Sequence, residues 1–128
     1  MKGATDVTGF ALIGHAWEMA RASGVTIEIN AGAIPLLDGA LKLAAAGVLT
    51  SADKTNREYV GNHVEIAESV NKDLVRLLYD PQTAGGMLIS ISAAKAPRLL
   101  ERLLENYPVA QVIGRVTELG AHSIAVKQ

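Results

Sequence analysis

The sequence predicts an α+β domain in which a mixed sheet of at least four strands is covered by about four helices. Segments with helical periodicity alternate with segments in which every second residue is apolar, and no internal repeat or heptad array interrupts them. The length of 128 residues suits one domain, because a chain of this size buries about two-thirds of its surface on folding. We therefore expect residues 1–128 to form a single domain.

The first elements are a helix and a strand. Residues 9–22 carry an apolar stripe at helical spacing, with Asp6 or Thr8 as the expected N-cap and Gly24 as the stop. Residues 25–29 then alternate apolar and polar side chains. This alternation is typical of a half-buried strand.

The middle of the chain contains two more predicted helices. One covers 37–46 and ends at a glycine, and the other covers 69–78, with Ser69 or Asn71 as its cap. Between them, residues 48–64 are rich in turn-forming residues and show no sustained period. We expect this segment to be a long, exposed connection.

The last part of the chain begins at Asp80-Pro81, which stops the preceding helix because a residue before proline is pushed out of the helical region. A strongly amphipathic helix begins at Ser92. Three strands complete the predicted sheet: 87–91, about 111–117 and 122–126.

Composition excludes several classes of protein. Twelve Lys and Arg against thirteen Asp and Glu leave a net charge of −1, so neither nucleic acid nor an anionic membrane has a basic surface to bind. Cysteine is absent, which removes disulfides, thiolate metal sites and a cysteine nucleophile from these residues. No apolar run reaches the roughly 18 residues of a membrane span, and the start lacks the apolar core of a signal peptide. We expect a cytoplasmic protein.

Common catalytic motifs are also missing: the chain has no Walker loop, GxGxxG, GxSxG or HExxH. His15, His63 and His122 are far apart in the sequence, and none has a second ligand type at helical spacing. We expect each to be a partly exposed or core-edge imidazole rather than a metal ligand or a base.

The first unusual loop is residues 5–10, which lead into the first predicted helix. Its simplest interpretation is structural, with Asp6 or Thr8 as an N-cap and Gly9 easing the turn. Alternatively, Asp6 lies beside a helix end that favours phosphate. There it could serve as a ligand of Mg²⁺, which usually takes one or two carboxylates together with phosphate oxygens.

The second unusual loop is residues 80–86, directly before a predicted strand. Its structural interpretation is a helix stop followed by a turn in which Gly85 and Gly86 supply positive φ. Its functional interpretation is a segment whose backbone amides and Thr83 hydroxyl approach an anion. The loop alone does not decide between the two.

Taken in order, the two loops and three further segments resemble the C-terminal domain of the selenophosphate synthetase (selenide, water dikinase) family. The likeness covers essentially the whole chain. The wider superfamily, named for aminoimidazole ribonucleotide synthetase, shares the fold and a looser form of the first loop. The segments that carry the resemblance are TDVTGFALIGH (5–15), LLDGA (36–40), NREYV (56–60), DPQTAGG (80–86) and IGRV (113–116).

This resemblance implies a function. In the family, ATP, selenide and water give selenophosphate, AMP and phosphate, and Mg²⁺ holds the triphosphate. The metal-binding aspartate of the first loop corresponds to Asp6. The phosphate-facing positions that the resemblance suggests are Thr8, Gly9, Thr83, Gly85 and Gly86.

The resemblance also implies that residues 1–128 are the C-terminal half of a two-domain enzyme that forms a homodimer. In the family, the N-terminal domain brings a glycine-rich segment, a lysine and a reactive cysteine or selenocysteine. Since none of these occurs here, we expect no catalytic residue in this chain and no dikinase activity from it alone.

The chain departs from the family pattern at three places. Ala11 replaces a frequent glycine, a change that a helix interior should tolerate or favour. Ala84 replaces a common serine, and residues 51–53 replace a more glycine-rich turn. None of these changes touches Asp6.

Two alternatives remain open. One is another ATP-dependent member of the superfamily, such as a thiamine-phosphate kinase or a hydrogenase-maturation protein. The other is a stand-alone binding or regulatory module descended from this domain. A cysteine or selenocysteine near a lysine, in a glycine-rich segment upstream of these residues, would favour the selenium enzyme over the first alternative. A reading frame that extends upstream by about another domain, roughly 100–200 residues, would favour it over the second.

Overall fold

A computed structural model describes residues 2–128 and confirms the mixed α+β architecture. Three short 3₁₀ turns accompany the main elements: Ala31–Ala33, Gly61–His63 and Ala93–Lys95. The helices and strands, in chain order, are β1 (Gly3–Asp6), α1 (Ala11–Ser23), β2 (Val25–Asn30), α2 (Ala40–Ala45), α3 (Ala52–Val60), β3 (Val64–Ile66), α4 (Lys72–Leu78), β4 (Met87–Ser90), α5 (Ala96–Leu104), β5 (Gly114–Glu118) and β6 (Ile124–Lys127).

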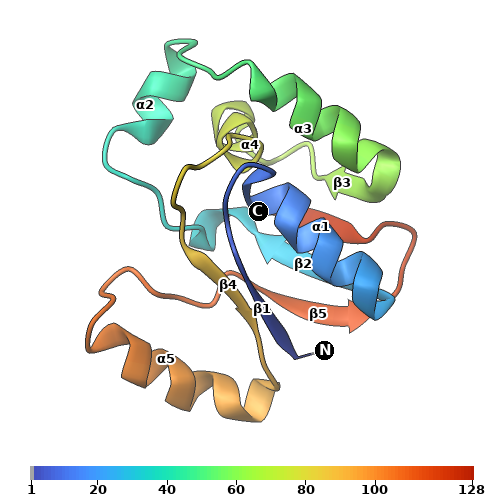
Figure 1. The fold of residues 1–128 in the computed structure, drawn as a ribbon, viewed down its shortest axis with the longest axis vertical. Coiled ribbons are helices and arrows are strands. Elements are labelled where there is room, and N and C mark those ends of the chain that lie inside the picture. The colour runs from blue at the N-terminus through green and yellow to red at the C-terminus, as the bar shows by residue number, and fades with distance from the viewer. Residues whose placement is uncertain (1) are drawn as a thin grey trace.

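The strands form two separate sheets. The larger has the order β3-β6-β2-β5, in which β2 pairs parallel with β6 and antiparallel with β5, while β3 pairs parallel with β6. The smaller consists of β1 and β4, which run antiparallel side by side (Figure 1). A mixed sheet of four strands is therefore confirmed, but one of its strands differs from the prediction. The strand expected over 87–91 forms β4 in the smaller sheet, and β3, which was not predicted, lies at the edge of the larger one.

The core lies between α1 and the larger sheet. Eight of the 13 residues of α1 are buried, and Ile13 is fully so. From the sheet, Ile29, Ile124 and Val126 supply large buried side chains. Burying such side chains contributes about 1.5–3 kcal/mol each, so α1 is the helix on which the fold depends most.

The predicted exposed connection over 48–64 is wrong, because the structure forms α3, a 3₁₀ turn and β3 there. The buried residues of α3 are Asn56, which is polar, and Val60, so no apolar stripe marks the helix. Its sequence signal is electrostatic. Asp53 pairs with Arg57 at 2.8 Å, and Lys54 pairs with Glu58 at 3.8 Å, each at i,i+4 spacing.

The start of α1 also differs from the prediction. Asp6 ends strand β1 and Thr8 lies beyond it, while the N-cap is Phe10, which makes no side-chain cap hydrogen bond. Asp6 and Thr8 are therefore not N-caps. By contrast, Asn71 caps α4 as predicted, because its side-chain oxygen accepts from the backbone N–H of Asp73 at 2.8 Å.

The expectation that a helix interior would favour Ala11 is wrong as well. Ala11 is the first residue of α1 and has φ of 61°, in the left-handed region that L-amino acids avoid. Its side chain is fully buried. The glycine that the family often has at this position would adopt this φ without steric cost.

The remaining predicted elements are confirmed, with bounds that differ by a few residues. The last helix differs from the others in position, since α5 stands apart from α1 to α4, beyond β4 (Figure 1). None of its residues is buried. Across residues 2–128, the helices are all too short or too polar to cross a bilayer.

Candidate functional site

The two motif loops lie side by side although 70 residues separate them in the chain. The backbone N–H of Val7 donates to the Gly86 carbonyl at 2.8 Å, and that of Gly85 donates to the Val7 carbonyl at 3.0 Å. A third bond joins the Gln82 N–H to the Thr8 carbonyl at 3.1 Å. These bonds continue the β1–β4 ladder, in which Asp6 faces Met87. We call residues 5–10 and 80–86 the paired loops.

Glycine has a different role here from the one expected. Neither Gly85 nor Gly86 has positive φ, so the predicted glycine turn is wrong. A Cβ on Gly85 would overlap the Val7 carbonyl oxygen and the Gln82 side chain, whereas one on Gly86 would meet open space. Gly85 therefore permits the close approach of the two loops, and Gly86 does not carry that constraint.

The NREYV segment (56–60) is hydrogen-bonded to the end of the first loop and to the residue just before the second. Asn56 is only 4% exposed, and its side-chain amide donates to the carbonyls of Gly9 and Tyr79 at 3.0 Å each. Next to it, the Arg57 guanidinium lies 4.1 Å from the centre of the Tyr79 ring. Asn56 thus joins the end of one loop to the start of the other. Neither the order of residues in this segment nor its family resemblance indicates that Asn56 binds these two carbonyls.

Asp6 stands at the open edge of the paired loops. It is exposed, and within residues 2–128 its carboxylate makes no hydrogen bond or ion pair. A search of the same residues finds no group of three or more His, Cys, Asp or Glu side chains that could enclose a metal ion. A single free carboxylate nevertheless fits Mg²⁺, which keeps several waters and takes phosphate oxygens as further ligands.

The other suggested phosphate-facing residues lie in the same region. Gly9, Thr83, Gly85 and Gly86 are exposed, while Thr8 is half-buried. The Thr8 hydroxyl lies 3.1 Å from Nε2 of His15, so this side chain already has a protein partner. The paired loops therefore bring together all of the suggested positions, together with Asp6.

His15 is a core-edge histidine, as expected, but it belongs to a chain of polar contacts. It is 8% exposed, and its Nδ1 lies 3.1 Å from Oε2 of Glu18. The Tyr59 hydroxyl donates to Oε1 of Glu18 at 3.0 Å. This bond raises the pKa of the Tyr59 hydroxyl above its ordinary value, so Tyr59 keeps its proton. The sequence did not indicate that Glu18 and Tyr59 contact one another or that Glu18 contacts His15.

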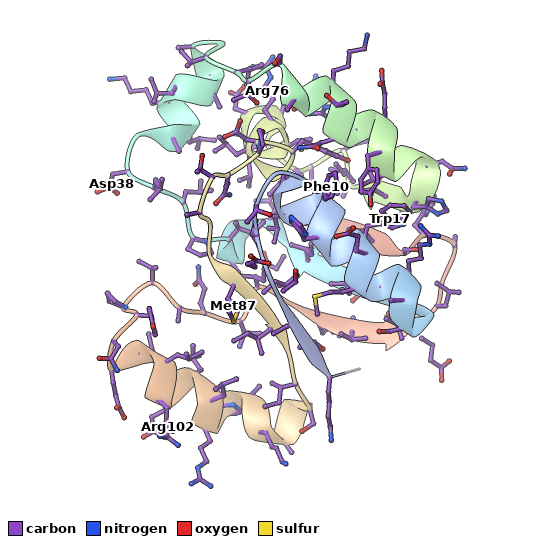
Figure 2. The ribbon with its side chains drawn as sticks, viewed as in Figure 1. Phe10, Trp17, Asp38, Arg76, Met87 and Arg102 are labelled. Atoms are coloured by element: carbon purple, nitrogen blue, oxygen red, sulfur yellow. The ribbon has the colours of Figure 1, made fainter. Side chains whose placement is uncertain are left out.

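Aromatic packing holds the same two helices together. Phe10 stacks on Tyr59 with ring centres 4.5 Å apart, and Trp17 meets the Tyr59 ring edge-on at 5.1 Å. Figure 2 shows Phe10 and Trp17 on the flank of α1 that faces α3. Gly14 is needed beneath Phe10, because a Cβ there would overlap the Cβ of Phe10. The polar contacts of His15, Glu18 and Tyr59 thus lie beside a cluster of three aromatic rings.

The two remaining histidines lie outside this arrangement. His63 is exposed and stacks on Trp17, with ring centres 5.4 Å apart. His122 is half-buried, and its Nδ1 lies 3.9 Å from a carboxylate oxygen of Glu65. Both placements agree with the expectation of partly exposed imidazoles.

Comparison with known proteins shows the family of the chain. The family described as AIR synthase related protein, C-terminal domain, matches residues 1–127. A protein of Clostridium botulinum named selenide, water dikinase is 40% identical over 123 residues, which cover 96% of this chain and 36% of that protein. Proteins of the same name from Caldanaerobacter subterraneus and Clostridioides difficile are 44% and 39% identical over 125 and 123 residues, and they are covered to 36% and 35% of their lengths. The chain thus spans about a third of the length of these relatives.

Proposed function

The chain belongs to the AIR synthase related protein, C-terminal domain, family, and on that premise we propose that it forms one wall of the ATP site of a selenide, water dikinase. The reaction converts ATP, selenide and water into selenophosphate, AMP and phosphate. The observation that carries the proposal is the pairing of two distant motif loops beside the free carboxylate of Asp6. The names of the curated relatives support the choice of substrate class.

The remaining parts of the enzyme would come from another domain. Since this chain corresponds to about a third of its relatives, the other two-thirds of their length can supply the nucleophile, the lysine and most phosphate ligands. We propose that this second domain is N-terminal in the same polypeptide and that the complete enzyme is a homodimer. The 128-residue chain alone is then inactive.

Within that site, each residue has a limited task. Asp6 would hold Mg²⁺, which neutralises charge on the phosphates when it is bound. Thr83 offers an exposed hydroxyl, and the glycines let backbone approach an anion closely. Phosphoryl transfer depends mainly on positioning and charge stabilisation, so a domain without a nucleophile can still be essential.

The test is the Asp6→Asn substitution in the complete enzyme. We expect selenide-dependent AMP formation to fall by about 100-fold, because a charge that stabilises the transferring phosphate is lost. The circular dichroism spectrum should not change, since Asp6 is exposed.

A matched control is Glu101→Gln on α5, which removes an exposed negative charge far along the chain from the paired loops. It should leave turnover unchanged. Near-normal turnover of Asp6→Asn would remove Asp6 from the site and overturn the proposed function. Robust AMP formation by the 128-residue chain alone would show that the second domain is not required.

A further inference from the structure

A continuous line of polar contacts runs from the paired loops to the surface of α3. It begins at the Thr8 hydroxyl, passes through both nitrogens of His15 and reaches the two carboxylate oxygens of Glu18, where Tyr59 ends it. The three contacts are Thr8 Oγ1 to His15 Nε2 at 3.1 Å, His15 Nδ1 to Glu18 Oε2 at 3.1 Å, and Tyr59 Oη to Glu18 Oε1 at 3.0 Å. This line of polar contacts joins α1, α3 and the first loop.

The donors and acceptors in this line follow from the chemistry of its members. An ionised carboxylate can only accept hydrogen bonds, so Nδ1 of His15 must carry the proton that it shares with Glu18. In a neutral imidazole, Nε2 is then bare and can only accept. When His15 is neutral, the Thr8 hydroxyl therefore donates its proton to Nε2 of His15. Only the oxygen lone pairs of Thr8 remain for any ligand of the paired loops.

We propose that His15 is a positioning residue that fixes the Thr8 hydroxyl as a hydrogen-bond acceptor in the paired-loop site. The ligand chemistry that fits such an oxygen, two residues after the Asp6 carboxylate, is a donor such as a water bound to a divalent cation. A bare phosphate oxygen does not fit, because Thr8 has no proton left to donate. The inference rests on the proposed function. It makes the Thr8 hydroxyl a hydrogen-bond acceptor toward the ligand, rather than a hydrogen-bond donor to a phosphate.

If His15 only stabilised the fold, it would make the same contacts, but losing them would lower stability rather than kcat. The ring contacts of Tyr59 with Phe10 and Trp17 already hold α1 against α3. Substitutions that keep these rings and change only the polar line therefore separate positioning from stability. Glu18→Gln and Thr8→Val are nearly isosteric changes of this kind.

The first experiment reads the protons directly. In the ¹⁵N-labelled 128-residue chain at pH 8.5, long-range ¹H–¹⁵N spectra should show His15 as the Nδ1–H tautomer. His63 is the internal control, because it is exposed and no hydrogen bond to its nitrogens is found within residues 2–128, so it should show a mixture of tautomers. An Nε2–H tautomer, or the same mixture as His63, would overturn the inference.

The second experiment uses the complete enzyme. We expect Thr8→Val and Glu18→Gln to lower kcat about 10-fold with little change in the KM for ATP, as is typical when a hydrogen-bonded partner behind a functional group is lost. Thr8→Ser, which keeps the hydroxyl, should restore most of the rate. Glu58→Gln, at an exposed carboxylate on α3, should behave as the unmodified enzyme.

The outcomes distinguish the two proposals. Normal kcat for Thr8→Val and Glu18→Gln, beside an inactive Asp6→Asn, would overturn the role of His15 and leave the proposed function intact. Normal turnover of Asp6→Asn would overturn the proposed function, and the tautomer of His15 would still decide how the Thr8 hydroxyl is held.

Discussion

Two amphipathic helices of this protein, α1 and α5, differ in how much of their surface is buried. Eight of the 13 residues of α1 are buried against the four-stranded sheet and α3. None of the nine residues of α5 is buried, and Leu104 at its end is 44% exposed. Figure 1 shows α5 standing apart from the helices that surround the larger sheet. A helical apolar stripe thus predicts a helix, but it does not predict what covers that stripe.

The difference extends to the loops. The start of α1 is joined to the paired loops, to Asn56 and to the polar line through His15. Among residues 2–128, α5 makes its most extensive contact with the 3₁₀ turn that precedes it. The paired loops therefore adjoin α1, the helix with the most buried residues. Rigid support of this kind is what a site needs if its groups are to be held in one geometry.

The largest expected difference between the two helices is in stability. Ile13→Ala removes a fully buried side chain and should lower the free energy of unfolding by about 3 kcal/mol. Leu104→Ala removes a half-exposed side chain and should cost less than about 1 kcal/mol. Urea unfolding of the 128-residue chain measures both. Equal losses would mean that α5 is packed as firmly as α1.

A second prediction concerns the support for the paired loops. Gly85→Ala should lower the free energy of unfolding by about 2 kcal/mol, because its methyl group would push against the Val7 carbonyl and the Gln82 side chain. Gly86→Ala adds the same group in open space and should change stability by less than about 0.5 kcal/mol. Thermal unfolding of the two variants, side by side, checks this. If Gly85→Ala is as stable as Gly86→Ala, the loops do not approach as closely as described.

The smallest effect is expected at two buried alanines of α1, Ala11 and Ala16. Ala16→Gly should cost about 1.5 kcal/mol, because a glycine weakens a helix interior and a buried methyl group is lost. Ala11→Gly loses the same methyl group but relieves a φ of 61°, worth about 1–2 kcal/mol, so its net effect should be near zero. Both alanines are fully buried, which makes them a matched pair. Equal costs in urea unfolding would contradict the strain at Ala11.

The sequence was informative where local periodicity matches the fold. The helices at 9–22, 69–78 and after Ser92, and the strands around 27 and 125, all follow from apolar spacing. Strand β1 did not follow, because its residues Gly3–Asp6 favour turns and form a strand only by pairing with β4, more than 80 residues away. Helix α3 was missed because its buried residues, Asn56 and Val60, do not form an apolar stripe.

The candidate site shows the same division. Family resemblance indicated Asp6 and both loops, but the bonds between the loops depend on tertiary structure and cannot be derived from either segment alone. Asn56 is a buried polar residue whose purpose becomes clear only when its two carbonyl partners are located. His15 was correctly placed at the edge of the core, yet its connection to Glu18 and Tyr59 required the packing of α1 on α3.

Amide hydrogen exchange in the 128-residue chain tests the pairing of the two loops most directly, because it reads their hydrogen bonds one at a time. The N–H groups of Val7 and Gly85 should exchange more slowly than that of Leu103 in α5, since the paired loops are fastened to the core and α5 is not. Exchange of Val7 and Gly85 at the rate of unprotected amides, or faster than Leu103, would contradict the pairing and with it the single site built from both loops.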